Sequence, residues 1–265
     1  MVRSQNNFSH YKKVAGEVRR KVLEMIYKAQ TSHIASNFSC IDILTVLHTK
    51  ILRSDKGGYL DKLIYSKGWV AAAAYVFLAR SGVIPEKDLE TYCADDSKYI
   101  GLVEPYVKGI EAAGGAMGHG LPIGVGMAMA YGREKSDKRV FVLMSDGEMD
   151  CGTTWESALL GAHHNLNNLI VIVDNNKWQA MGRTNEVLNI EPLADKWRAF
   201  GWGVTEIDGH NYNEIELALC GEMSVPQVII ANTIKGKGVS FMEDDLKWHY
   251  KNISDEEYQL ALKEL

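Results

Sequence analysis

Asp146 and Asn176 are oxygen-bearing residues whose placement fits the ligands of a hard metal ion. Each closely follows an apolar run that predicts a buried strand, residues 140–144 in the first case and 169–173 in the second. The carboxyl ends of parallel strands are where open α/β sheets bind their ligands. A carboxylate and an amide oxygen suit Mg²⁺ or Ca²⁺, and Mg²⁺ usually completes its shell with phosphate and water. The pair therefore predicts a metal–diphosphate site.

The segment around Gly147 fits an anion at the same place. A glycine directly after a strand lets phosphate oxygens approach the backbone closely. The helix predicted over residues 153–164 would present free N–H groups to that anion. Taken alone, Ser145-Asp146-Gly147-Glu148 is more typical of an ordinary strand–turn–helix with an Asp-Gly turn. The second ligand, again after a buried strand, favours the metal–diphosphate interpretation.

Strands and helices alternate along the rest of the chain. Short apolar runs predict strands at residues 63–66, 203–207 and 227–231. Helical spacing predicts helices at residues 11–30, 40–52 (with Ser39 as N-cap), 69 onward, 121–131, 192–200 and 211–220. A loop and a short final helix are expected after residue 232. This alternation predicts an α/β fold, with a mostly parallel sheet and helices on both faces.

The composition is that of a soluble globular protein of 265 residues, of which 46% are hydrophobic and 24% charged. This length fits a single α/β domain over residues 1–265. A net charge of −5 without a Lys/Arg run argues against nucleic acid as the main partner. The start is too polar for a secretory signal, and no apolar stretch approaches the ~18 residues of a membrane helix. Four cysteines without metal or redox spacing indicate reduced thiols in the cytoplasm.

The glycine-rich segment 114–120 superficially resembles a dinucleotide fingerprint, but it follows a polar loop rather than a strand. It is better interpreted as a loop that passes close to a flat ligand, or simply as a flexible turn. Within it, Met117 is by residue type alone more typical of the core. His33 and His249 are by type alone more typical of structural positions than of catalytic ones.

At these residues the sequence resembles the thiamine diphosphate enzymes, whose shared motif is a small residue and Asp-Gly, followed further along the chain by Asn-Asn. It is most similar to the amino-terminal part of transketolase, and in particular of transketolases encoded as two subunits. The matching segments occur in the family's order along nearly the whole chain, at residues 33–36, 41–44, 66–68, 115–122, 146–156, 174–178, 233–238 and 248–249.

The resemblance implies thiamine diphosphate as cofactor, bound through Mg²⁺ (or Ca²⁺). Asp146, Asn176 and the backbone carbonyl of Trp178 would be the metal ligands. His33 matches a histidine that lines the substrate channel and His249 one near the diphosphate and the donor sugar, so both are implied as catalytic residues. The implied cofactor-binding residues are Ser36, Lys67, Trp69, Gly115, Ala116, Met117, Asp146, Gly147, Glu148, Asn176, Ile234, Lys235 and His249.

Three positions depart from the family pattern. Trp69 stands where a histidine is expected, and ungapped counting places Gly101 at the position of another. Cys151 replaces a glutamate, whereas Glu156, a second family glutamate, is retained. In the family such glutamates help to link paired active sites across a dimer interface. The two lost histidines put the standard sugar-phosphate substrates in doubt.

The resemblance implies transfer of a two-carbon ketol unit from a ketose (phosphate) donor to an aldose acceptor. In the family, a glutamate that faces the aminopyrimidine belongs to a pyrimidine-binding domain, which is absent from this sequence. We therefore expect that domain on a partner subunit, in an α₂β₂ complex without which the chain is inactive. Two alternatives stay open: a subunit of a 2-oxo acid decarboxylase or dehydrogenase, and a non-catalytic cofactor-binding protein.

Overall fold

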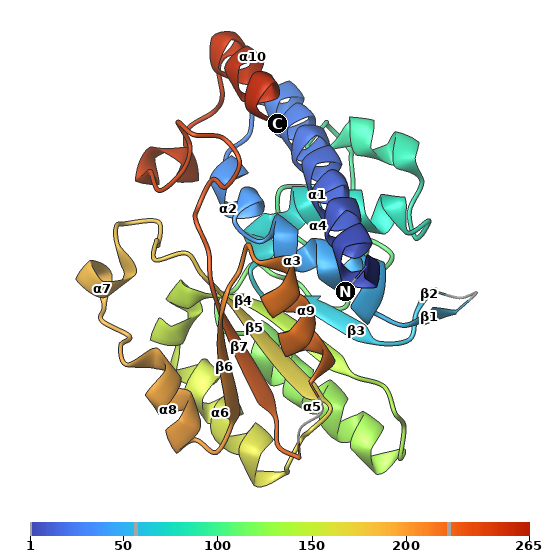
Figure 1. Cartoon of the computed structure of the whole chain (residues 1–265), viewed down its shortest axis with the longest axis vertical. Helices are drawn as coiled ribbons and strands as arrows, with labels where there is room; N and C mark the ends of the chain where they lie inside the picture. The colour runs from blue at the N-terminus through green and yellow to red at the C-terminus, as the bar shows by residue number, and fades with distance from the viewer. Residues whose placement is uncertain (1, 56–57, 222–223) are drawn as a thin grey trace.

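A parallel β-sheet forms the centre of the molecule (Figure 1). The computed structural model describes residues 2–55, 58–221 and 224–265, and within these ranges the sheet has five strands in the order β3-β4-β5-β7-β6. The strands are β3 (Lys62–Tyr65), β4 (Val140–Ser145), β5 (Leu169–Asn175), β6 (Gly203–Asp208) and β7 (Gln227–Asn232). Each neighbouring pair is parallel. The predicted α/β class is confirmed.

Alternate residues of the central strands pack into two separate hydrophobic cores. On β4, Phe141 and Leu143 join one core, whereas Val140 and Val142 join the other. The first core is covered by α1 (Val2–Ala29), α3 (Ile41–Val46), α4 (Ala71–Arg80) and α9 (Tyr212–Cys220), and the second by α5 (Gly120–Arg133), α6 (Gly152–His163) and α8 (Leu193–Ala199). Helices thus bury both faces of the sheet, which explains why its central strands are continuous apolar runs.

The register of the sheet places two turns side by side: the turn after β4, which carries Asp146, and the turn after β5, which carries Asn176. These are called the motif turns below. Ser145, the last residue of β4, pairs with Asp174 on β5. Asp146 and Asn176 therefore leave the sheet at the same edge. The last residues of β5 and β7 also pair, so the loop that follows β7 starts at this edge as well.

Shorter elements surround the sheet. They are α2 (Ile34–Phe38), α7 (Thr184–Val187), α10 (Asp255–Glu264), the pair β1 (Ser54–Asp55) and β2 (Gly58–Tyr59), and 3-10 helices at Gly68–Val70, Glu86–Thr91, Asp146–Asp150 and Leu246–His249. After β7 the chain runs past α2 and ends in α10, which packs against α1 (Figure 1). The last segment therefore passes over the edge where the motif turns lie.

Residues 40–52 differ from the single helix predicted for them. The α-helix begins at Ile41 and continues as a π-helix over Leu47–Ile51. Ser39, predicted as the N-cap, lies one residue too early, and its hydroxyl donates instead to the Asp174 carboxylate (2.5 Å). A buried carboxylate requires such donors, so a long-range contact replaces the local cap.

The other predicted helices and strands lie close to their expected positions. The first helix starts earlier than its apolar spacing indicated, at Val2. The alanine-rich helix starts at Ala71 because Gly68–Val70 forms a 3-10 turn. Across the residues that the structure describes, no helix is both long and apolar enough to cross a membrane.

Candidate active site

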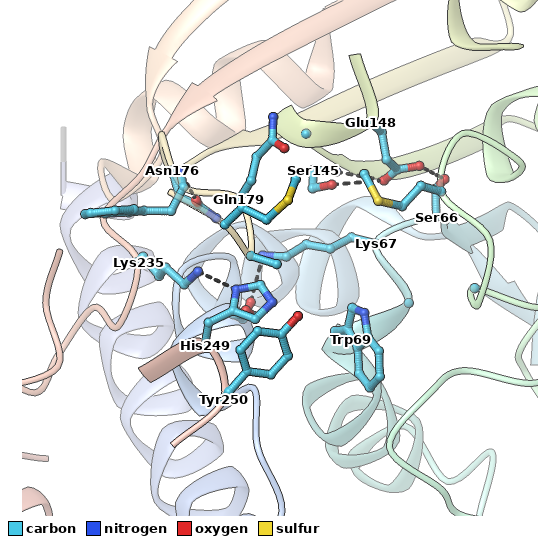
Figure 2. A pocket seen from close by; sticks show the side chains of 18 of the residues that line it. Ser66, Lys67, Trp69, Ser145, Glu148, Asn176, Gln179, Lys235, His249 and Tyr250 are labelled. Atoms are coloured by element: carbon cyan, nitrogen blue, oxygen red, sulfur yellow. Dashed lines mark hydrogen bonds between the residues drawn. The ribbon is translucent and has the colours of Figure 1, made fainter. Parts of the chain in front are cut away.

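A cavity of about 250 Å³ lies at the carboxyl ends of β3, β4 and β5 (Figure 2). Its walls are the turn after β3, the glycine-rich loop 114–120, the turns after β4 and β5, and the segment after β7 that carries Lys235 and His249. Segments far apart in sequence thus meet at one edge of the sheet, as the topology of an open α/β sheet requires.

Asp146 is buried behind this cavity, and three donors hold its carboxylate. Oδ1 accepts the Gly147 N–H (2.9 Å), and Oδ2 accepts the Lys177 N–H (2.7 Å) and the Thr184 hydroxyl (3.0 Å). Burial and, secondarily, the charge of Asp174 raise the pKa of Asp146 to about 6. A bound cation would counteract this shift, because it favours the charged carboxylate.

Asn176 and Trp178 lie on the tight turn after β5. Between them, Lys177 has a left-handed backbone (φ 68°), and Asn176 Oδ1 accepts the Trp178 N–H (3.0 Å). The Trp178 indole donates to Asp244 (2.7 Å), whereas its carbonyl accepts no hydrogen bond from any described residue. This carbonyl and the second lone pair of Asn176 Oδ1 therefore remain available beside Asp146.

These oxygens fit a hard cation that brings phosphate ligands with it. Within the described ranges, no group of three or more His, Cys, Asp or Glu side chains is placed to hold a metal ion. A cation here would take one carboxylate, one amide and one carbonyl oxygen from the protein. Mg²⁺ commonly binds few protein oxygens and completes its octahedron with substrate phosphate and water.

Asp174 connects the turn of Asn176 and Trp178, called the metal-ligand turn below, with the rest of the site. It was not predicted as a site residue. Its buried carboxylate accepts hydrogen bonds from the Lys67 ammonium and the Thr233 hydroxyl. It also accepts from the Ser39 hydroxyl (2.5 Å) and from Asn176 Nδ2 (3.3 Å). Burial opposes its ionisation, but the charge of Lys67 and these hydrogen bonds lower the pKa of Asp174 below its usual value. Its signals in the sequence are its place at the end of an apolar strand and within the matching segment 174–178, and neither indicates this role.

The Lys67 ammonium uses all its donors beneath the cavity. Besides Asp174, it donates to the Ser36 carbonyl oxygen (2.7 Å) and the Ser39 hydroxyl (3.0 Å). An ammonium has three donors, so none remains for a ligand in this arrangement. Lys67 therefore neutralises Asp174 and supports the floor of the cavity.

Lys235 and His249 form a hydrogen-bonded pair on the cavity wall (Figure 2). Lys235 Nζ lies 2.7 Å from His249 Nδ1. Burial and the charge of Lys67 lower the pKa of Lys235 to about 8, and burial and the charge of Lys235 lower the pKa of His249 to about 3. At neutral pH an ammonium therefore donates to a neutral imidazole, whose proton sits on Nε2. His249 thus supplies the cavity with an N–H donor.

Glu148 joins three walls of the cavity. Its buried carboxylate accepts the Ser66 hydroxyl, the Gly118 N–H (3.1 Å) and the Ser145 N–H (2.9 Å). These donors belong to the turn after β3, the glycine-rich loop and the end of β4. Burial raises the pKa of Glu148. Its oxygens are therefore engaged in holding the walls together.

The glycine-rich loop lies directly on the backbone that follows β3. A Cβ on Gly68 would come within 2.0 Å of the Gly114 carbonyl oxygen, so only glycine permits this approach. The approach places Gly115 and Met117 on the cavity wall, where Met117 is 54% exposed. The interpretation of Met117 as core, from residue type alone, is wrong. Ala116 lies on the same loop but does not line the cavity.

His33 lies behind Trp69 rather than on the cavity wall. The two rings are stacked, with centroids 3.8 Å apart and planes 5° from parallel. Trp69 lines the cavity and is 44% exposed, whereas His33 is 5% exposed. His33 Nδ1 lies 2.6 Å from the Ser32 hydroxyl, and Nε2 has no partner among the described residues. Burial and, less strongly, the lysines Lys235 and Lys67 lower the pKa of His33 to about 4, so its ring is neutral at pH 7.

Most of the predicted site residues meet at this cavity. Those that line it are Ser36, Lys67, Trp69, Gly115, Met117, Gly147, Glu148, Asn176, Trp178, Lys235 and His249. Those that do not are His33, Ala116, Asp146 and Ile234. The Ile234 N–H donates to His210 Nε2 (2.9 Å), and His210 does not line the cavity either. The cavity is also lined by residues that were not predicted as site residues, all within or near a recognised motif: Ser66, Gly68, Gly114, Ser145, Gln179, Ala180, Met181 and Tyr250.

The two other departures, Gly101 and Cys151, and the retained Glu156 lie outside the cavity wall. A Cβ on Gly101 would lie 3.7 Å from the Tyr92 hydroxyl, in a surface region before the glycine-rich loop. Cys151 packs against Gly118, where an added Cβ would come within 2.6 Å of it. Glu156 is exposed on α6. None of the three touches the metal-ligand turn.

The sequence matches the family model described as "Transketolase, thiamine diphosphate binding domain" over residues 10–265. The chain belongs to the transketolase family. It is 38% identical over 254 residues to one of the subunits of the apulose-4-phosphate transketolase of Phocaeicola vulgatus, an alignment that covers 93% of this chain and 90% of that one. It is 35% identical over 259 residues to "6-deoxy-6-sulfo-D-fructose transketolase subunit SqwG" of Clostridium sp. (strain MSTE9), covering 95% and 94% of the two chains. This transketolase chain is thus a transferase that corresponds to one component of two-component transketolases and acts with a partner subunit.

Solved transketolases share the fold of this chain over part of their length. The crystal structure of transketolase from Campylobacter jejuni superposes with a TM-score of 0.88 at 30% sequence identity, covering 94% of this chain and 41% of that one. Human transketolase is 28% identical over 268 residues, which are 43% of its length. The chain therefore spans about two-fifths of these longer transketolases and matches their thiamine diphosphate-binding domain.

Proposed function

We propose that this transketolase subunit transfers a two-carbon ketol unit from a ketose, free or phosphorylated, to an aldose acceptor as one half of a two-component enzyme. The observation that carries the proposal is the meeting of Asp146 and Asn176 at adjoining strand ends, at the cavity that also contains the Lys235–His249 pair. The first pair suits a metal-bound diphosphate. The second suits the polar, reacting end of a sugar.

Thiamine diphosphate, when bound, supplies the carbanion chemistry of ketol transfer. We expect Asp146, Asn176 and the Trp178 carbonyl to hold the Mg²⁺ or Ca²⁺ of the cofactor. A Cβ on Gly147 would lie 3.2 Å from Gln179 and 3.6 Å from Met117, which both line the cavity, so the glycine leaves room for the phosphates beside the backbone.

The rest of the cavity wall provides orientation and hydrogen bonds. Met117 and the flanking residues Gly115 and Ala116 are proposed to hold the rings of the cofactor from the glycine-rich loop. Lys235 has two donors beyond its bond to His249, and they suit an anionic diphosphate. His249 Nε2–H would donate to an oxygen of the donor sugar or of the diphosphate.

The chain is proposed to be one diphosphate-binding domain, with the pyrimidine-binding domain on its partner in an α₂β₂ complex. Leu159 and Leu160 on α6 and Ile123 on the adjacent α5 are exposed. Large apolar side chains gathered on a surface mark an interaction site. These helices lie on the face of the sheet opposite α1 and α9 (Figure 1). We assign this α5–α6 surface to subunit contacts.

Affinity purification of the tagged chain from its native cells, with thiamine diphosphate and Mg²⁺ present, tests the proposal. Native mass spectrometry is expected to show two copies of the chain with two copies of a subunit that has a pyrimidine-binding domain. Release of CO₂ from pyruvate by the purified complex, without ketol transfer, would favour the 2-oxo acid alternative. Recovery of the chain alone at saturating cofactor would favour a non-catalytic cofactor-binding protein.

A further inference from the structure

Trp69 presents one free face of its indole to the cavity. His33 covers the other face as a parallel ring 3.8 Å away, yet 44% of the Trp69 surface remains exposed. Figure 2 shows Trp69 and Tyr250 on the side of the cavity away from Asn176, and therefore away from the proposed metal–diphosphate end. An exposed tryptophan with a rigid backing is a large flat surface on which a ligand can pack.

The Trp69–His33 stack is fixed by the backbone around it. Asn37 Nδ2 donates to the His33 carbonyl (2.9 Å) and to the Trp69 carbonyl (3.0 Å), while Asn37 Oδ1 accepts the Ala73 N–H (3.0 Å). His33 also has a left-handed backbone (φ 70°), a conformation that persists only where the surroundings enforce it. The indole is thus held in place before any ligand arrives.

The aromatic side chains around Trp69 are uncharged. Its neighbours are the rings of His33 and, beyond it, His249 and Tyr250, with centroids 4.9 and 5.5 Å from that of His33. Both histidines are neutral at pH 7, because burial lowers the pKa of His33 to about 4 and that of His249 to about 3. Lys67, which lies two residues before Trp69 in the sequence, has all its donors engaged on the cavity floor. This wall therefore suits the C–H surface of a polyol chain better than an ionised group.

We infer that Trp69 determines donor specificity: its free indole face packs against an uncharged carbon segment of the ketose, and His33 acts as a positioning residue that supports the indole. The inference rests on the proposed ketol-transfer function and names the part of the substrate that this site recognises. It differs from a cofactor contact of Trp69. It also differs from a direct role of His33 in proton transfer, since His33 is 5% exposed, its free Nε2 is buried and it does not line the cavity.

The test uses the purified complex of the chain with its partner subunit. The measured quantity is the ratio of kcat/KM for a ketose donor to kcat/KM for hydroxypyruvate. Hydroxypyruvate carries a ketol unit but no sugar chain, so this ratio reports how much the enzyme gains from contacts with the chain. Trp69→Ala is expected to lower this ratio by about tenfold, through a higher KM for the ketose. Trp69→Phe, which keeps a flat apolar ring, should lower it less. Tyr106→Ala, which removes an exposed tyrosine outside the cavity, is the matched control.

His33 is tested by His33→Asn, since asparagine tolerates the left-handed backbone. This variant is expected to lower the same ratio, and to add nothing in a Trp69→Ala background. A loss of kcat with both donors in that background would show that His33 acts directly and would overturn its positioning role.

Two further outcomes would overturn the inference about Trp69. One is an unchanged ratio in Trp69→Ala, and the other is a raised Kd for thiamine diphosphate with an unchanged ketose KM, which would make Trp69 a cofactor residue. If the unmodified complex transfers the ketol unit but Trp69→Ala leaves the ratio unchanged, only the inference about Trp69 is overturned and the proposed function stands. Absence of ketol transfer from any donor by the unmodified complex would overturn the proposed function as well.

Discussion

Asp174 bridges Lys67 and Asn176 beneath the cavity: its carboxylate accepts hydrogen bonds from the Lys67 ammonium and, at 3.3 Å, from Asn176 Nδ2. One buried carboxylate thus balances the charge of a buried lysine and orients the Asn176 amide, whose oxygen accepts the Trp178 N–H and keeps its second lone pair for a metal ion. The metal-ligand turn and the cavity floor are therefore one hydrogen-bonded unit.

Asp174→Asn is expected to destabilise the fold, because it leaves the Lys67 ammonium buried without a counter-ion. The free energy of unfolding should fall by about 3–5 kcal/mol in urea titrations followed by circular dichroism. Asp244→Asn breaks a more exposed ion pair, with Arg183, and should cost no more than about 1 kcal/mol. Equal losses in the two variants would contradict the role of Asp174, and adding Lys67→Met to Asp174→Asn should recover part of the loss.

Asp146→Asn is expected to weaken Mg²⁺-dependent binding of thiamine diphosphate to the complex by more than about tenfold, since it removes the one carboxylate of the proposed metal site. Isothermal titration calorimetry at several Mg²⁺ concentrations measures this change. Asp195→Asn, on the exposed surface of α8, is the control and should bind normally. An unchanged Kd in Asp146→Asn would exclude this carboxylate as a ligand.

Binding of the diphosphate should weaken as the pH rises through about 8, to which burial and Lys67 lower the pKa of Lys235. The sign follows from the charge: the protonated ammonium attracts the anion, and loss of its proton removes that attraction. A bound anion raises the pKa, so the effect is expected in Kd rather than in the activity of the saturated enzyme. Lys235→Met should bind weakly at every pH and lose this dependence. A Kd that stays flat between about pH 7 and 9 in the unmodified complex would contradict the prediction.

Leu159→Arg is expected to prevent assembly with the partner subunit without unfolding the chain, because it places a charge in the proposed α5–α6 surface. Leu217→Arg is matched to it: both leucines are exposed on helices, but Leu217 lies on α9, on the other face of the sheet. Size-exclusion chromatography with light scattering should show a free subunit only for Leu159→Arg. Normal assembly of both variants would move the interface elsewhere.

The fold could be predicted from local patterns because the central strands are buried on both faces. Residues 140–144 and 169–173 are apolar throughout, and their Asp-Gly and Asn-Asn continuations locate the edge of the sheet that binds ligands. The predicted neighbourhood of Lys235 and His249 depended on the family resemblance, since no local pattern relates them to β4 or β5.

What could not be predicted depends on contacts between distant parts of the chain. Lys67 and Asp174 are 107 positions apart, and nothing in either segment indicates that the lysine would be used internally. His33 and Trp69 meet through the turn that Asn37 holds, so sequence alone could not show that the indole covers the histidine. The predicted N-cap at Ser39 fails for the same reason, because Asp174 takes its hydroxyl.

The most direct test of the account is ketol transfer by reconstituted subunits. The chain and the partner isolated with it are assayed separately and mixed, with thiamine diphosphate, Mg²⁺, a carbon-13-labelled ketose donor and an aldose acceptor, and the products are analysed by mass spectrometry. We predict a labelled two-carbon unit on the acceptor in the mixture only, with turnover lost when Asp146→Asn replaces the unmodified chain. Transfer by the chain alone, or undiminished transfer with Asp146→Asn, would contradict the account.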